Sequence, residues 1–280
     1  MPQHAIEVSQ KERFEFGANW TRFLSILSDE RIDEAKASLR KMLGQDTLEG
    51  KTFLDIGSGS GLFSLAARML GAKVHSFDYD SQSVACTQEL RRRYFPDDPN
   101  WVVEERSVLD KEFIRNLGCF DIVYSWGVLH HTGSMWEALE NVIPSVRPGG
   151  ILFIAIYNDQ DYISRRWLRL KKLYNKNPML RLPLAIYTLI KQWGMTLLPE
   201  AIKGRPLRSW NEYKKSRGMS PWYDIVDWIG GLPFEVAKPE EIFDFYRSKG
   251  FVLQRMKTCG GGLGCNEYVF VQKMDGEQSS

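Results

Sequence analysis

The chain has 280 residues, and its 37 lysines and arginines against 35 acids give a formal net charge of +2. Hydrophobic residues make up 43% of it, which is too many for a disordered chain, and the length suits one large domain or a core domain with an insertion. No run approaches the roughly 18 apolar residues of a membrane-spanning helix. The start has no apolar signal core and four cysteines are too few for a disulfide framework, so we expect a soluble, cytoplasmic protein.

The first 50 residues are predicted to form a helical extension. Between Ile32 and Leu43, apolar residues recur every three or four positions, which is typical of a helix with one apolar stripe. Gly44 then provides a typical helix end.

Residues 51–157 show predicted strands that alternate with predicted helices. Because their apolar runs do not alternate cleanly with polar residues, each run is expected to be a strand buried on both faces, as in a parallel sheet. These runs lie at 53–56, 74–77, 101–103, 120–126 and 151–157. The intervening helices are predicted at 62–70, 83–94 and 135–145, the last with a capping box made by Ser134 and Glu137.

This alternation predicts an α/β fold with a doubly wound, Rossmann-like sheet of seven strands. A basic, aromatic-rich and mostly helical insertion interrupts it at 158–237. The pattern resumes at 238–273 with one helix, which Pro239 begins, and two closing strands. Residues 274–280 form a short tail.

A glycine-rich turn joins the first strand to the helix after it. Gly57, Gly59 and Gly61 let the backbone turn sharply and come close to a ligand. A dinucleotide site would have a further glycine at Leu62. The carboxylate of Asp55 would repel a pyrophosphate but would suit a cationic amine.

The end of the second predicted strand adds an acidic residue. Asp78 lies about twenty positions after the turn, where it can accept hydrogen bonds from ribose hydroxyls, and Tyr79 follows it. The turn, Asp55 and Asp78 together form a far more specific signal than a glycine turn alone.

Four segments resemble the class I S-adenosylmethionine-dependent methyltransferases, and most of all their ubiquinone-biosynthesis O-methyltransferase group. They are FLDIGSGSG, FDYD, FDIVYSWGVLHH and RPGGILFIAIYN. The resemblance covers residues 51–156 and 238–273, and it implies S-adenosyl-L-methionine as the cofactor. The cofactor contacts that it implies are Asp55, Gly57, Ser58, Gly59 and Gly61 for the methionine moiety, Asp78 with Tyr79 beside it for the ribose, Ser107 and Val108 for the adenine, and Tyr124, Ser125 and Trp126 for the methyl-donor pocket.

Two adjacent histidines are the candidates for a catalytic base. His130 and His131 follow the fourth predicted strand, at the edge where open α/β sheets bind ligands. An imidazole there is suited to accept a proton from an alcohol or phenol near neutral pH, and His131 is the preferred candidate. The alternative is a histidine that only braces the following turn. His75 is predicted to pack within the second strand and His4 to lie in a frayed terminus, and no pair of histidines, cysteines or acids has metal-ligand spacing.

The insertion is expected to set the substrate. Residues 162–217 hold fourteen lysines and arginines against two acids. Basic and apolar residues together favour an anionic membrane surface or an anionic, lipid-linked acceptor over nucleic acid. The plain alternative is a helical cap that packs on the core. The candidate substrate contacts are Tyr157, Asn158, Arg165, Arg166, Trp222 and Tyr223.

The sequence therefore predicts a methyltransferase that acts on a hydroxyl of a small or lipid-linked molecule, such as a phenol, quinone precursor or sugar. No Asn/Asp-Pro-Pro-aromatic tetrapeptide follows the fourth predicted strand, which counts against N6-adenine-type chemistry. Two alternatives stay open, an RNA methyltransferase that holds phosphates with the insertion and a non-catalytic scaffold at a membrane surface.

Overall fold

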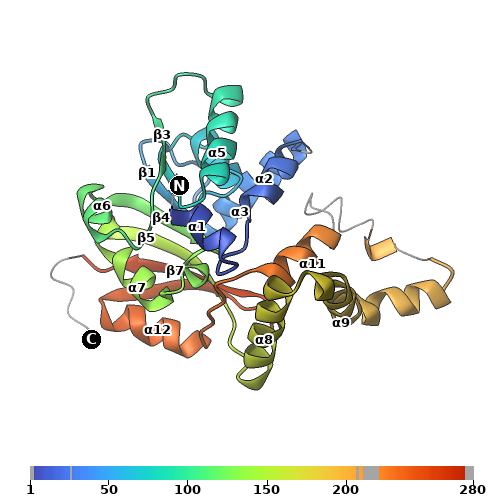
Figure 1. Ribbon diagram of the computed structural model, residues 1–280. Coiled ribbons are helices and arrows are strands. Elements are labelled where there is room, and N and C mark those ends of the chain that lie inside the picture. The colour runs from blue at the N-terminus through green and yellow to red at the C-terminus, as the bar shows by residue number, and fades with distance from the viewer. Residues whose placement is uncertain (1–2, 26, 206–207, 211–220, 275–280) are drawn as a thin grey trace.

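Seven strands form one sheet in the order β3-β2-β1-β4-β5-β7-β6 (Figure 1). The computed structural model describes residues 3–25, 27–205, 208–210 and 221–274. The first five strands in this order are parallel, and β7 runs antiparallel to both of its neighbours. The strand bounds are β1 Thr52–Ile56, β2 Lys73–Asp78, β3 Trp101–Glu105, β4 Phe120–Trp126, β5 Val146–Tyr157, β6 Phe251–Lys257 and β7 Cys265–Gln272. The predicted seven-stranded, Rossmann-like sheet is confirmed.

Helices cover both faces of the sheet because successive strand residues point to opposite sides. Phe53 belongs to one buried apolar cluster and Leu54 to another. The first cluster includes side chains of α3 Asp29–Leu43, α4 Leu62–Met69 and α5 Ser81–Tyr94. The second includes side chains of α6 Lys111–Asn116, α7 Met135–Asn141 and α12 Pro239–Ser248.

Three local expectations are wrong. The strand β3 is not buried on both faces, because it is the edge strand of the sheet and Val102 is exposed. The predicted capping box at α7 does not form, because the side chain of Ser134 makes no cap hydrogen bond. Instead, the carboxylate of Glu235, about a hundred residues along the chain, accepts from the Met135 amide at 3.0 and 3.1 Å. The single helix expected at 135–145 is also interrupted, with a 3₁₀ turn, η2, at Ile143–Ser145.

The N-terminal extension lies over the carboxyl edge of the sheet. The helices of the extension near this edge are α1 Gln3–Ser9 and α2 Gly17–Leu24, while its third helix, α3, packs in the first apolar cluster. The Phe14 amide donates to the Leu232 carbonyl at 3.0 Å, and the Gly17 amide donates to the Asp80 carboxylate at 2.8 Å. His4 packs edge-on against Tyr79, so the expectation of a frayed end at His4 is wrong.

The insertion forms a helical cap beside the sheet (Figure 1). Its described elements are α8 Tyr162–Lys176, the 3₁₀ turn η3 Pro178–Leu180, α9 Arg181–Ile202 and α11 Pro221–Gly230. The three α-helices share a small core of their own, with Trp167, Tyr174, Ala185 and Ile229 buried in it. Among the described residues, no helix is both long and apolar enough to cross a membrane.

Candidate active site

A cavity of about 1260 Å³ opens where the parallel strands end at their carboxyl edge. Residues after β1, β2 and β4 form its floor, and the N-terminal extension and the cap form its sides. Its volume exceeds the roughly 300–1,000 Å³ of an ordinary ligand pocket, so it has room for two molecules side by side.

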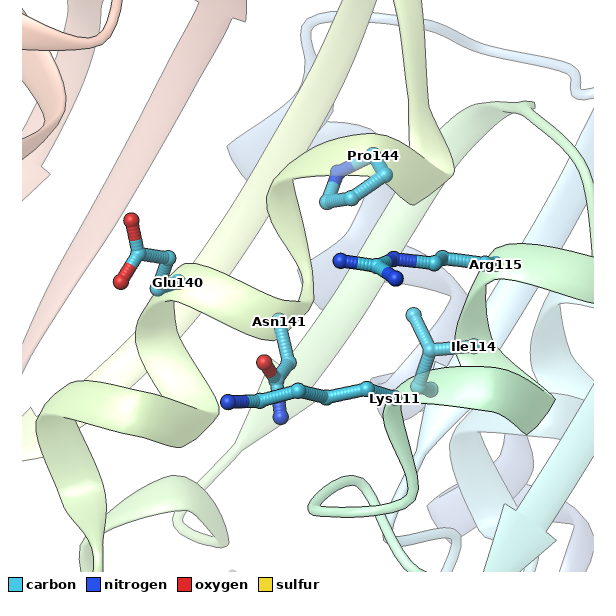
Figure 2. Close-up of a pocket in the computed structure, with 6 residues that line it drawn as sticks. All are labelled: Lys111, Ile114, Arg115, Glu140, Asn141 and Pro144. Atoms are coloured by element: carbon cyan, nitrogen blue, oxygen red, sulfur yellow. The ribbon is translucent and has the colours of Figure 1, made fainter.

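A second hollow of about 200 Å³ lies between α6 and α7 (Figure 2). Arg115 and Pro144 on its wall precede the starts of β4 and β5. It therefore lies near the amino edge of the sheet, away from the edge where parallel sheets bind ligands.

The glycine turn uses its own amides to fix its shape. The amides of Gly57 and Ser58 donate to the Phe77 carbonyl at 2.8 and 3.1 Å, and the Gly59 amide donates to Asp78 at 2.9 Å. A pyrophosphate would need such amides as donors, so the turn is poorly suited to a dinucleotide. Gly57 and Gly59 have positive φ angles of 77° and 55°, and a Cβ on Gly57 would lie 2.3 Å from Val128.

Asp55 ends a buried chain of hydrogen bonds that begins at the sheet edge. The Trp101 indole donates to Ser76 Oγ at 3.0 Å, the Ser76 and Ser64 hydroxyls are 2.7 Å apart, and Ser64 donates to Asp55 at 2.5 Å. Burial raises the pKa of Asp55 to about 7, against the lowering effect of the Ser64 bond and with a small increase from the charge of Asp78. Asp55 lines the cavity, so it is placed to hold a cation there.

Asp78 is fixed by two backbone amides. One carboxylate oxygen accepts from Gly59 and the other accepts from Asp80, both at 2.9 Å. Burial raises the pKa of Asp78 to about 6, although these hydrogen bonds lower it. Each oxygen keeps a second lone pair for a hydroxyl donor from the cavity.

His131 ends the 3₁₀ turn η1 Leu129–His131 and lines the cavity. Its Nδ1 lies 2.5 Å from the Pro233 carbonyl oxygen, which only accepts, so Nδ1 carries the proton. Burial, with smaller contributions from Lys171 and Arg13, lowers the pKa of His131 to about 3. The ring is therefore neutral near pH 7 and its Nε2 has a free acceptor lone pair.

His130 is fully buried and does not line the cavity. Its Nδ1 accepts from the Tyr157 amide at 3.4 Å, and its ring packs on that of Tyr157 with centroids 3.9 Å apart. Burial holds its pKa well below the usual value. The structure therefore places His130 as a support for Tyr157, with no contact to the cavity.

The outer half of the cavity is aromatic. Trp126, Tyr157 and Trp228 line it, together with Lys191 of the cap. Tyr157 and Trp228 meet edge to face with centroids 5.2 Å apart. Such walls suit a flat, apolar acceptor, and the lysine adds one positive charge.

The cavity brings together most of the residues expected at the cofactor site. These are Asp55, Gly57, Ser58, Gly59, Asp78, Tyr79, Ser107, Val108, Tyr124 and Trp126. Gly61 and Ser125 do not line it. A Cβ on Gly61 would lie 2.8 Å from the Thr87 backbone, and the Ser125 hydroxyl donates to the Ile56 carbonyl at 2.9 Å. Gly61 therefore lets the start of α4 pack against α5, and Ser125 is a packing residue of the sheet.

The expected substrate contacts are mostly elsewhere. Of the candidates whose side chains the structure describes, only Tyr157 lines the cavity. Asn158 donates to the Gly262 carbonyl and accepts from Asn266, which fixes the loop between β6 and β7. Arg165 and Arg166 are exposed on α8 and Trp222 packs against the core of the cap, so these three do not line the cavity. The remaining candidate is Tyr223, whose side chain lies outside the described residues.

Sequence reasoning missed the N-terminal wall of the cavity. Arg13 donates to the His131 carbonyl at 2.7 Å and lies over the Tyr79 ring at 5.0 Å, and the Phe16 ring is 5.0 Å from that of His131. Trp20 also lines the cavity. The available signal was the aromatic residues in an otherwise polar segment. Among the described residues, no group of three or more histidines, cysteines and acids is placed to hold a metal ion.

Comparison with protein families gives one match over most of the chain. Residues 28–215 match the family described as Methyltransferase domain. Among curated relatives, the tRNA U34 carboxymethyltransferase of Methylococcus capsulatus is 35% identical over 108 residues, which cover 38% of this chain and 32% of that protein. The ubiquinone biosynthesis O-methyltransferase of Caulobacter vibrioides is 31% identical over 116 residues, or 39% of this chain and 42% of the relative. The matches thus span less than half of these relatives.

Two solved structures share the fold. PKMT2 from Rickettsia typhi, in complex with AdoHcy, has a TM-score of 0.57 at 13% identity and covers 85% of this chain and 52% of that one. Magnesium protoporphyrin IX methyltransferase from Synechocystis, with bound SAM, has a TM-score of 0.51 at 11% identity and covers 86% and 79%. At such low identity, the likeness concerns the fold alone.

Proposed function

The chain belongs to the methyltransferase domain family, and on this basis we propose that it transfers the methyl group of S-adenosylmethionine to a hydroxyl of a small or lipid-linked molecule. A phenol, a quinone precursor and a sugar are the acceptor classes. One observation carries the proposal, namely that a buried carboxyl at Asp55, a partly buried one at Asp78 and an aromatic chamber next to a neutral His131 share one cavity.

The residues at the sheet edge fit S-adenosylmethionine. When bound, the cofactor supplies an electrophilic methyl group on a sulfonium centre. Asp55 would hold the positively charged amine of its methionine moiety, and Asp78 would accept hydrogen bonds from its ribose hydroxyls. The turn, whose Gly57, Ser58 and Gly59 amides are already engaged, fits a ligand without phosphate.

The residues of the outer chamber fit an acceptor with a hydroxyl. Trp126, Tyr157 and Trp228 would orient a ring so that its oxygen meets the methyl group in line, which is the larger part of catalysis for such a displacement. His131 Nε2 would accept the hydroxyl proton, since Nδ1–H is committed to Pro233. Because the pKa of His131 is low, its ring is a weak base. It would therefore take the hydroxyl proton while the bond between the acceptor oxygen and the methyl carbon forms, and not before.

Calorimetry with S-adenosylmethionine and S-adenosylhomocysteine is the first test. Micromolar binding to both is the expected result, followed by transfer of isotope-labelled methyl to a panel of phenols and lipid-linked sugars. Binding of neither compound would contradict the proposal and favour a scaffold protein.

An RNA acceptor is the second candidate. The arginines exposed on α8 and the relative named as a tRNA enzyme favour it. The results that would support it are RNA binding whose affinity falls steeply with salt, and methyl transfer to RNA with no transfer to the phenol panel.

A further inference from the structure

We propose that the outer surface of α8 and α9 docks on an anionic lipid bilayer and so places the mouth of the cavity at the membrane. We call this surface the docking face. It consists of exposed apolar side chains on α9 and exposed basic side chains on α8. Docking is independent of methyl transfer and is tested without cofactor or acceptor.

An apolar stripe on α9 is left uncovered. Leu182, Ile186 and Ile190 are 61, 43 and 62% exposed. Because they are four residues apart, they share one side of the helix, while Ala185 and Thr188 are buried on the side that packs against the cap. Met179, in the turn before α9, is 87% exposed. Several large aliphatic side chains exposed so close together indicate a surface that contacts another molecule.

A basic row on α8 flanks that stripe. Arg165, Arg169 and Lys172 are exposed at helical spacing, and they share one side of α8. Arg166 donates to the Tyr187 hydroxyl at 2.6 Å, which ties the two helices together. Tyr187 precedes Ile190 by three residues and lies about 60° from it round the helix. The bond thus brings the basic side of α8 to the border of the apolar stripe.

The apolar stripe and the basic row together fit an anionic membrane better than a second copy of the chain or RNA. Aliphatic side chains flanked by cations are what a helix lying in the headgroup layer of an anionic membrane presents. A second copy of the chain, joined through the same face, would oppose like charges in a symmetric interface. RNA would meet the cations, but Leu182, Ile186 and Ile190 offer it neither stacking nor hydrogen bonds.

The docking face is continuous with the mouth of the cavity. Lys191 and Gln192 line the cavity, and they directly follow Ile190 of the stripe. A membrane that contacts the stripe therefore lies beside the entrance, where an acceptor with an apolar tail can pass between the bilayer and the aromatic chamber.

Vesicle co-sedimentation tests the docking face. Vesicles of phosphatidylcholine containing about one third phosphatidylglycerol are expected to bind the full chain at low salt, and pure phosphatidylcholine vesicles are expected to bind it far less. The double variant Ile186→Ser/Ile190→Ser removes two of the three side chains of the stripe and is expected to bind the anionic vesicles about a hundredfold more weakly. The triple variant Arg165→Gln/Arg169→Gln/Lys172→Gln is expected to show a similar loss, because each charge near such a surface contributes roughly fivefold.

Matched controls come from the exposed surface of the chain outside the cap. Val252→Ser changes an exposed valine on β6, and Lys41→Gln/Lys73→Gln/Arg115→Gln removes three exposed charges there. Both are expected to bind vesicles like the unchanged chain, and all variants are expected to keep its melting temperature.

Three results would overturn the proposal. The first is equal binding to neutral and anionic vesicles, and the second is unchanged binding by both docking-face variants. The third is the absence of vesicle binding together with one of two other interactions. These are a dimer that Ile186→Ser/Ile190→Ser abolishes in sedimentation analysis, or RNA binding that the triple variant Arg165→Gln/Arg169→Gln/Lys172→Gln abolishes.

Discussion

The two halves of the cavity are built in different ways. The inner half comes from the ends of β1 and β2 and the turns that follow them. The amides of Gly59 and Asp80 hold Asp78, and Asp55 lies beside Ser76 across the β1–β2 strand pair. The outer half joins Phe16, His131, Tyr157 and Trp228, which lie far apart in sequence. Its geometry therefore depends on how the extension, sheet and cap pack. We expect substitutions in the inner half to change cofactor affinity and those in the outer half to change turnover or acceptor binding.

The largest expected effect is in the outer half, at His131. His131→Ala is expected to lower kcat by on the order of a hundredfold, because a positioned base contributes at least that much to proton removal. The dissociation constant for S-adenosylmethionine is expected to stay within about twofold, measured by calorimetry. His75→Ala, which changes a histidine bound to Glu104 on the neighbouring strand, is the control. Full activity of His131→Ala would reduce this residue to a brace between η1 and Pro233.

In the inner half of the cavity, a substitution of Asp78 is expected to change cofactor affinity. Asp78→Ala is expected to weaken cofactor binding by roughly ten- to a hundredfold, because hydrogen bonds to a charged acceptor contribute about 1.5–3 kcal/mol each. Asp121→Ala removes a carboxylate held in a similar way by the Thr52 amide, far from the cavity, and its cofactor affinity should be unchanged. If both Asp78→Ala and Asp55→Ala bind the cofactor as tightly as the unchanged chain does, the site assignment is contradicted.

Lys191 distinguishes a cap that contacts the acceptor from one that only packs. Lys191→Ala is expected to raise KM for an anionic acceptor by about fivefold, through loss of a partly exposed charge pair, with kcat and cofactor affinity unchanged. Lys203→Ala removes an exposed lysine just after the same helix, outside the cavity, and is the matched control. The same KM in both variants would limit the cap to packing and docking.

An effect of similar size is expected in the pH dependence of cofactor affinity. With a pKa raised to about 7 by burial, Asp55 is mostly protonated at pH 6 and mostly charged at pH 7.5. A cationic ligand lowers this pKa, so it binds the charged form and its affinity rises with pH by about five- to tenfold over that range. Calorimetry in buffers of different ionisation enthalpy should show proton release on binding. Asp55→Asn should abolish both the release and the slope, and a flat profile in the unchanged chain would place the cation elsewhere.

Buried histidines also link stability to pH. The folded-state pKa of His131 is lowered to about 3, so between pH 3 and about 6.5 the unfolded chain binds a proton that the folded chain does not. Stability therefore falls as pH falls through this window, by up to about 1.4 kcal/mol per pH unit for one group. His131→Gln is expected to flatten this slope in urea unfolding between pH 6.5 and 5, and an unchanged slope would mean that the ring is not buried in a neutral state.

Most of the sheet was predictable because its signals are local. Buried parallel strands have continuous apolar runs, and helices between them have apolar stripes. The edge position of β3 was not predictable, since it depends on strand order. The start of α7 at Met135 was predicted, but its cap was not, because the cap comes from Glu235, which tertiary packing brings to the Met135 amide.

For the site, the sequence by itself determined the glycine turn, Asp55 and Asp78, because their interactions run between neighbouring residues or across adjacent parallel strands. Only the tertiary structure decided that His131 lines the cavity while His130 lies beneath it, and that Arg13 and Phe16 close the wall beside them. The physical reason is that side-chain direction after a strand depends on what packs against it. His131 is set by the Pro233 carbonyl and His130 by the Tyr157 amide and ring, and neither partner can be identified from spacing along the chain.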